Sequence, residues 1–187
     1  MINTFILIVS FNRKELLLQC LQALSVQTQQ PSKILIVDNA STDGTIETLQ
    51  QNGWLEQSKI QLIALKENTG GAGGFSAGMQ SAFEQGADYV WMMDDDAVPH
   101  PTALEEIMRY VTPEHIYGSL AVNGEDTAWA TTLLAENKTV HLKKQVSELA
   151  EVQSLPFLGF LTSKEIYQNI GLPDASYFIA ADDVEYC

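Results

Sequence analysis

Four short apolar runs along the first half of the chain constrain its fold more than any other feature. They lie at residues 5–9, 34–37, 60–65 and 89–93. The fourth run is short, continuous and rich in β-branched and aromatic residues, which is typical of a buried strand, and the third contains one polar residue, Gln61. Segments with helical character separate them, and the clearest has Leu17, Cys20, Leu21 and Leu24 at helical spacing. This alternation predicts an α/β fold with a doubly wound, mainly parallel sheet, and 187 residues suffice for one such domain.

Charge and cysteine content narrow the class of protein. With 10 Lys and Arg against 24 Asp and Glu, the formal net charge is −14, which argues against nucleic acid or an anionic membrane as the main partner. Two cysteines are too few for a disulfide framework. No apolar run reaches the length of about 18 residues that indicates a transmembrane helix, and the amino terminus lacks the basic segment of a signal peptide. We therefore expect a cytoplasmic protein, with a peripheral position at the inner face of the membrane as the alternative.

Polar residues follow each apolar run, where the predicted strands end. Arg13 follows the first run, Asp38 the second, Asn68 the third and an acidic triplet the fourth. Because the carboxyl ends of parallel strands share one edge of a sheet, we expect these residues to line one rim. Such a rim is the usual place for a nucleotide pocket in sheets of this kind.

The acidic triplet, Asp94, Asp95 and Asp96, is the strongest single signal. Three adjacent carboxylates at the end of a buried strand repel one another, and a cation can offset that cost. Carboxylate oxygens are ligands that suit Mg²⁺ and Mn²⁺. The functional interpretation is an Asp-x-Asp metal and diphosphate site. The alternative is a solvated acidic turn that caps the next helix.

Asp38 and Arg13 each have a functional and a structural interpretation. The Asp38 carboxylate could accept the imide N–H of a uracil or thymine ring, or it could cap the turn at residues 39–44. The Arg13 guanidinium suits a phosphate or a base edge, but the residue could equally be a solvated member of the first helical turn.

The stretch from Asn68 to Gly74 is rich in glycine and precedes a helix expected at about residues 75–85. It predicts a loop whose backbone can approach a ligand closely, with Asn68, Gly70 and Gly71 as candidate contacts. A phosphate could rest on the N–H groups at the start of that helix. The stretch lacks the lysine and hydroxyl residue of a P-loop, so the pattern alone is weak.

The second half of the chain shows weaker patterns. Short strands are expected at about residues 117–122 and 128–133, and another at 156–161. Residues 135–153 are polar and poorly periodic, and we expect them to be mobile. Ser163 is expected to cap a short helix.

A second acidic cluster lies near the end of the chain, with Asp182, Asp183 and Glu185. If a helix begins here, its dipole favours these carboxylates, so a helix cap is one interpretation. The other is a general base that faces the metal site and whose pKa is raised by its charged neighbours.

Taken together, these motifs resemble those of the family 2 glycosyltransferases, which have the GT-A fold. The matching segments occur in the family's order and lie at residues 9–13, 37–44, 68–75, 93–96 and 179–186. The glycine-rich stretch together with a triple Asp looks most like the galactofuranosyl- and rhamnosyltransferase-like branch.

The resemblance implies an inverting, metal-dependent transfer of a sugar from a UDP- or dTDP-linked donor to a glycan or lipid-linked acceptor, in surface polysaccharide synthesis. The positions that match nucleotide-sugar contacts are Arg13, Asp38, Asn68, Gly70, Gly71 and Asp95. Asp94 and Asp96 match the ligands of Mn²⁺ or Mg²⁺. Asp183 matches the base that deprotonates the acceptor hydroxyl, with Asp182 as the neighbouring alternative.

The resemblance also divides the single domain, residues 1–187, into a nucleotide-binding half at 1–98 and an acceptor-side half at 99–187. The family usually continues well past the base, whereas this sequence ends four residues after Asp183, so we expect a chain truncated at its C-terminus. The alternative function is therefore a nucleotide-sugar-binding module without turnover. A nucleotidyltransferase ranks lower, because the first run is not followed by a basic glycine-rich loop.

Overall fold

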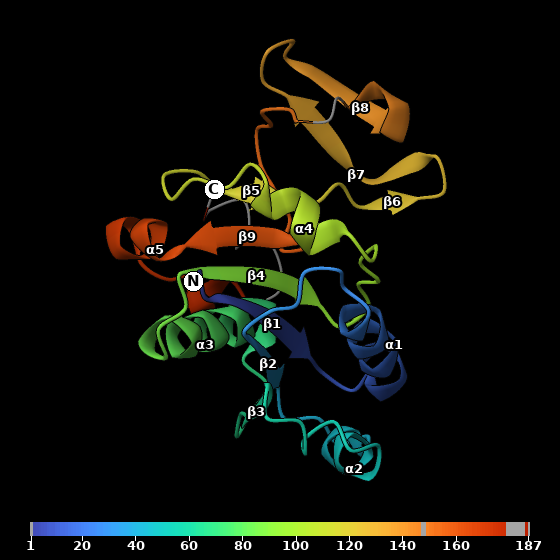
Figure 1. Ribbon diagram of the computed structural model, residues 1–187, viewed down its shortest axis with the longest axis vertical. Helices are drawn as coiled ribbons and strands as arrows, with labels where there is room; N and C mark the ends of the chain where they lie inside the picture. Colours follow the sequence, from blue (N-terminus) through green and yellow to red (C-terminus); the bar gives the residue numbers. More distant parts are fainter. Residues whose placement is uncertain (1, 147–148, 179–185, 187) are drawn as a thin grey trace.

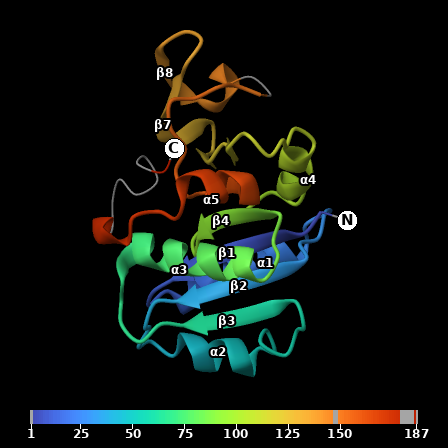
Figure 2. The same ribbon diagram turned by 90° about the vertical axis from the view of Figure 1, so that its left-hand side faces the viewer.

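A six-stranded sheet organises the computed structural model, which describes residues 2–146, 149–178 and 186. The strand order is β3-β2-β1-β4-β9-β5. Four strands are parallel: β1 (Thr4–Ser10), β2 (Lys33–Asp38), β3 (Ile60–Ala64) and β4 (Tyr89–Asp94). The strand β9 (Phe160–Ser163) runs antiparallel to β4 and to the short β5 (Tyr117–Gly118). The predicted mainly parallel sheet is confirmed, and Figure 2 shows β1, β2 and β3 side by side.

Helices cover both faces of this sheet (Figure 1). One face packs on α1 (Lys14–Ser25), α2 (Thr45–Gln51) and α4 (Ala103–Met108). The other face packs on α3 (Gly70–Glu84), with α5 (Lys164–Ile170) beside it. Successive residues of a strand point to opposite faces, so Ile6 joins the first of these cores and Leu7 the second. Both faces are therefore apolar, which explains why the strands are continuous apolar runs.

The helix α3 begins at Gly70, five residues earlier than the sequence predicts. Two of its glycines, Gly74 and Gly78, pack against the sheet. A Cβ on Gly74 would lie 2.6 Å from Val9 Cγ1, and one on Gly78 would lie 2.9 Å from Val37 Cγ2. The glycines therefore let the helix approach β1 and β2 closely, and the expected loop over residues 68–74 is wrong for residues 70–74.

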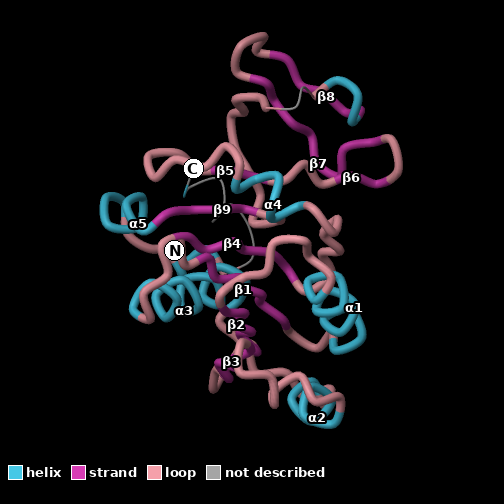
Figure 3. The backbone as a smooth tube through the Cα atoms, viewed as in Figure 1, coloured by secondary structure: helices cyan, strands magenta, loops and turns pink. Residues whose placement is uncertain are grey.

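A second, three-stranded sheet stands apart from the main one at the top of Figure 1, and Figure 3 shows the loops that join them. It consists of β6 (Val122–Asn123), β7 (Asp126–Leu133) and β8 (Lys138–Leu142), followed by the 3-10 helix η1 (Lys143–Gln145). Within residues 135–153, which the sequence leaves without a predicted element, β8 forms and pairs with β7, and the expected mobility of this stretch stays a prediction. Val140 is the one buried residue of β8, and a single buried position leaves no period in the sequence.

Two boundaries in the second half also differ from expectation. The strand expected at 117–122 is divided between the main sheet, through β5, and the small sheet, through β6. The strand expected at 156–161 starts at Phe160. Ser163 caps α5 as predicted, since its Oγ accepts a hydrogen bond from the Ile166 N–H at 3.0 Å.

Candidate functional site

The registers of three neighbouring strands bring most of the predicted site residues to one edge. In the β1–β2 pair Ser10 lies opposite Asp38, and in the β1–β4 pair Val9 lies opposite Asp94. Asp38 and the acidic triplet therefore flank the end of β1 on its two sides. We call this edge, with Arg13, Asp38 and Asp94 to Asp96, the rim.

The three aspartates of the triplet differ in exposure. Asp95 is 3% exposed, whereas Asp94 and Asp96 are exposed. The Ser10 hydroxyl donates a hydrogen bond to Asp95 Oδ2 at 2.7 Å, across the gap between β1 and β4. Burial raises the pKa of Asp95, and the hydrogen bond from Ser10 and the charge of Arg13 offset part of that rise. Asp95 thus ties two strand ends together, and its neighbours on either side reach solvent.

Arg13 forms ion pairs with two aspartates of the triplet. Its Nη1 lies 3.1 Å from Asp96 Oδ2 and 3.5 Å from Asp95 Oδ1. The guanidinium therefore bridges one buried and one exposed carboxylate. Arg13 precedes α1 but its side chain makes no capping hydrogen bond to that helix. The side chain is 54% exposed and the residue directly precedes α1, so the interpretation as a solvated residue at the first helical turn stays open beside the functional one.

The two carboxylate oxygens of Asp38 differ in their partners. Its Oδ2 accepts the Ser41 N–H at 3.1 Å, so one oxygen does cap the turn. Its Oδ1 is buried and has no hydrogen-bond partner among the described residues. A buried carboxylate oxygen without a donor is costly, and a ligand N–H would satisfy it.

Asn39 is a residue of the rim that sequence reasoning missed. It is buried, its Nδ2 donates to the Gly70 carbonyl at 2.8 Å, and its Oδ1 accepts the Thr69 N–H at 2.9 Å. It thereby fastens the start of α3 to the end of β2. The only sequence signal was an amide side chain directly after a strand-end aspartate.

The start of α3 is already engaged by the protein itself. The Gly70 N–H donates to Asn68 Oδ1 at 2.9 Å, and the Ala72 N–H donates to the Phe178 carbonyl at 3.4 Å. Phe178 lies so close to Gly70 that a Cβ there would overlap its carbonyl group. A phosphate at this position would have to displace Phe178, so the contacts of Asn68, Gly70 and Gly71 with a ligand stay predictions.

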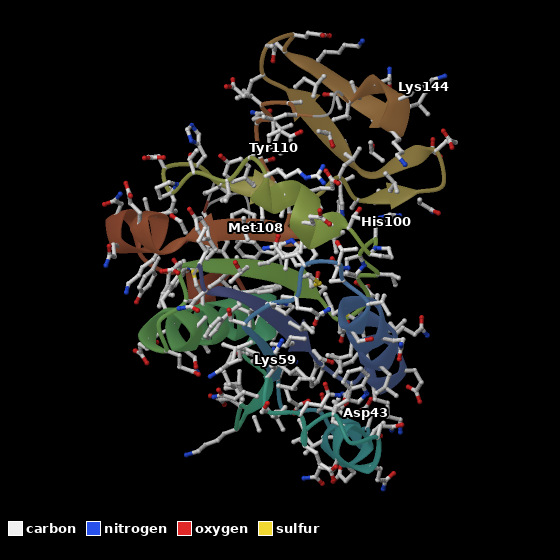
Figure 4. The ribbon with its side chains drawn as sticks, in the orientation of Figure 1. Asp43, Lys59, His100, Met108, Tyr110 and Lys144 are labelled. Atoms are coloured by element: carbon white, nitrogen blue, oxygen red, sulfur yellow. The ribbon has the colours of Figure 1, made fainter. Side chains whose placement is uncertain are left out.

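Asp43 lies between α1 and α2 (Figure 4) and contacts the first residue of each helix. Its Oδ2 accepts the Lys14 N–H at 3.2 Å, and its Oδ1 accepts the Thr45 N–H at 3.1 Å. One carboxylate therefore caps the start of both helices. Burial acts to raise the pKa of Asp43, but hydrogen bonds from Thr45 and Lys14 outweigh it and lower that pKa.

The carboxylates of the rim fit a divalent cation that is shared with a ligand. In the part of the chain that the structure describes, no group of three or more His, Cys, Asp or Glu side chains is placed to enclose a metal. Mg²⁺ is, however, commonly held by one or two carboxylates together with substrate phosphates. Asp94 and Asp96 provide two exposed carboxylates at one strand end, so they fit this second arrangement.

Asp182 and Asp183, the two candidate bases, lie outside the described residues. Tyr186, which follows them, is buried, and its hydroxyl donates to the Gly171 carbonyl at 3.1 Å. Desolvation raises the pKa of this hydroxyl to about 12. Tyr186 is thus part of the core beside α3, and the roles of the two aspartates stay predictions.

Known sequences match this chain over most of its length. The family model "Glycosyl transferase family 2" matches residues 5–171. Galactofuranosyltransferase GlfT1 of Mycolicibacterium smegmatis is 28% identical over 192 residues, which cover 95% of this chain and 62% of that protein. The dTDP-rhamnosyl transferase RfbF of Shigella flexneri is 23% identical, with 99% of this chain and 62% of that protein covered. The chain thus spans 62% of the length of these curated relatives.

Among solved structures, the mannosyltransferase PcManGT of Pyrobaculum calidifontis, in complex with GDP-Man and Mn²⁺, has a TM-score of 0.69 at 18% identity. The match covers 98% of this chain and 50% of that one. At this identity the likeness shows the fold, and the predicted GT-A architecture is confirmed. In the described ranges, no helix combines the length and apolarity needed to cross a membrane.

Proposed function

Because the chain belongs to glycosyl transferase family 2, we propose that it binds a UDP- or dTDP-linked sugar at the rim and transfers the sugar, with inversion, to a glycan or lipid-linked acceptor. The relatives named galactofuranosyl- and dTDP-rhamnosyl transferase support the predicted branch, and the name of the second supports a dTDP-linked donor. The two relatives also support a place in polysaccharide synthesis.

The observation that carries this proposal is the placement of carboxylates in two different environments, one buried and one exposed, on either side of β1. Asp38, with its unsatisfied Oδ1, lies on one side, and the exposed Asp94 and Asp96 lie on the other. A nucleoside diphosphate has the matching polarity, with a base at one end and phosphates at the other. Uracil and thymine present an N3–H that a carboxylate can accept, whereas cytosine presents a lone pair there.

The residues divide the work of transfer. Asp38 binds the base. Arg13 contacts the diphosphate directly, and the triplet Asp94 to Asp96 acts on it through a bound cation. A Mn²⁺ or Mg²⁺ ion held by Asp94 and Asp96 would supply positive charge beside the departing nucleoside diphosphate. Asp183, or Asp182 as the alternative, accepts the proton of the acceptor hydroxyl as its oxygen bonds to the anomeric carbon and the bond from that carbon to the phosphate oxygen breaks.

Calorimetry with three nucleotides tests the donor side. UDP and dTDP should bind in Mn²⁺ and bind far more weakly in EDTA, because carboxylates and diphosphate repel one another without a cation. CDP should bind more weakly than UDP at the same Mn²⁺ concentration, because its N3 faces the Asp38 carboxylate with a lone pair. Equal UDP affinity in Mn²⁺ and in EDTA would contradict the metal dependence.

Release of nucleoside diphosphate from the donor, with and without candidate acceptors, then tests turnover. Acceptor-dependent release supports the transferase. Binding without release supports the alternative, a module that holds nucleotide-sugar but does not turn it over.

A further inference from the structure

Two side chains of the rim, Arg13 and Asp96, bind each other, although each has a different proposed ligand. Asp96 is a proposed ligand of the cation, and Arg13 is a proposed contact of the diphosphate. In the structure these two side chains instead bind each other, with Arg13 Nη1 donating to Asp96 Oδ2 at 3.1 Å. Neither can perform its proposed role fully while this ion pair is closed.

We propose that Arg13 is a resident counter-ion of the triplet: it holds Asp96 until a divalent cation takes that carboxylate, and it then turns to the diphosphate of the donor. This inference rests on the proposed function and adds an order of events to it. The ligand that completes the exchange is a cation–diphosphate pair, which supplies both a positive partner for Asp96 and a negative partner for Arg13.

The exposure and the hydrogen bonds of Arg13 and its neighbours favour the opening of the Arg13–Asp96 ion pair. The Arg13 side chain is 54% exposed and that of Asp96 is 48% exposed, so water screens the pair and its contribution is small. The side chain of Arg13 makes no capping hydrogen bond to α1, so its release leaves the helix intact. The buried Asp95 keeps its hydrogen bond from Ser10 when Arg13 departs, and the triplet therefore stays in place.

The exchange couples the two ligands. Cation and diphosphate both favour the open ion pair, so each should bind more tightly in the presence of the other. The coupling also predicts effects of opposite sign when Arg13 is removed. A cation alone gains access to Asp96, whereas the diphosphate loses a partner.

The test is Arg13→Gln, with Arg109→Gln as the matched control. The Arg109 side chain is 55% exposed and pairs with Glu105 at 3.2 Å and Glu106 at 2.8 Å, so both variants lose one similarly exposed, doubly paired arginine and the same net charge. Mn²⁺ binding without nucleotide is measured by electron paramagnetic resonance, with the double variant D94N/D96N as the baseline for binding elsewhere on this acidic chain. UDP binding is measured by calorimetry at saturating Mn²⁺.

Arg13→Gln should bind Mn²⁺ roughly two- to five-fold more tightly than the wild type, as expected from losing a competing exposed ion pair. It should bind UDP roughly ten-fold or more weakly, as expected from losing a charged hydrogen bond. Arg109→Gln should change neither value, and Arg13→Lys should restore the weaker Mn²⁺ binding because it keeps the charge.

Unchanged or weaker Mn²⁺ binding in Arg13→Gln, with normal binding in the wild type, would overturn this inference and leave the proposed function standing. If the wild type bound no more Mn²⁺ than D94N/D96N, with or without UDP, the metal-dependent function and this inference would fail together.

Discussion

The main sheet and the small sheet of this molecule differ in how many of their residues are buried. Every residue of β1 is buried, and so are five of the six residues of β2. In the small sheet, β7 and β8 bury one residue each, Leu133 and Val140. Buried apolar area is the main source of folding free energy, so the strands that carry the rim are held far more firmly than β7 and β8. The difference teaches that burial in this chain is concentrated in the strands that carry the rim, where the donor is proposed to bind.

If the rim binds the donor and the later half performs chemistry on the acceptor, one substitution should separate the two. In a chain that turns over donor, Asp183→Asn should lower the transfer rate by about 10²–10⁴-fold, because an amide cannot take the proton of the acceptor hydroxyl. Metal-dependent donor binding, measured by calorimetry, should stay nearly unchanged.

Asp182→Asn is the control for that experiment. If Asp182 caps a helix, as one interpretation of the sequence has it, Asp182→Asn should affect stability by about 1 kcal/mol and leave the rate nearly unchanged. An inactive Asp182→Asn beside an active Asp183→Asn would move the base by one residue, and two active variants would place it elsewhere.

Within the main sheet, Asp38→Ala should cost more in binding than in folding. Loss of one charged hydrogen bond to the base should weaken UDP binding by about 1.5–3 kcal/mol. The matched control is Asp43→Ala, which removes the cap shared by α1 and α2 and should lower the melting temperature with little effect on UDP affinity. Normal UDP affinity with a lowered melting temperature in Asp38→Ala would leave Asp38 a turn cap only.

The sequence predicts those elements whose burial leaves a local pattern and misses those held by contacts between distant residues. The main sheet follows from continuous apolar runs, because strands buried on both faces leave that pattern. The start of α3 does not follow, since glycine disfavours helices locally, and the packing of Gly74 on Val9 and the hydrogen bonds of Asn39 offset this only in the folded chain. The hydrogen bond from Ser10 to Asp95 joins residues 85 positions apart, so no local pattern reports it.

Glycines of α3 offer a sharper test of how tightly the main sheet is packed. Gly78→Ala should destabilise the fold by about 1–3 kcal/mol, because the added Cβ meets Leu7 and Val37 in a full core. Gly71→Ala is the control, since the nearest atom to its Cβ would be the Phe178 oxygen at 4.0 Å. It should be neutral or slightly stabilising in urea denaturation. Alanine is the better helix former, so a gain of stability in Gly78→Ala would mean that helix propensity outweighs packing, and equal losses in both variants would mean that contact with Leu7 and Val37 does not set the cost.

The smallest effect is expected in the small sheet, and a pair of tryptophans measures the contrast directly. Trp129 on β7 is 61% exposed, whereas Trp91 on β4 is fully buried. Trp129→Ala should change the free energy of unfolding by no more than about 0.5 kcal/mol, as surface substitutions do. Trp91→Ala should cost about 3–5 kcal/mol, because it leaves a large cavity between β4 and its helices. If Trp129→Ala destabilised the fold by more than about 2 kcal/mol in urea, the small sheet would be as essential to the core as β4, and the comparison between the two sheets would fail.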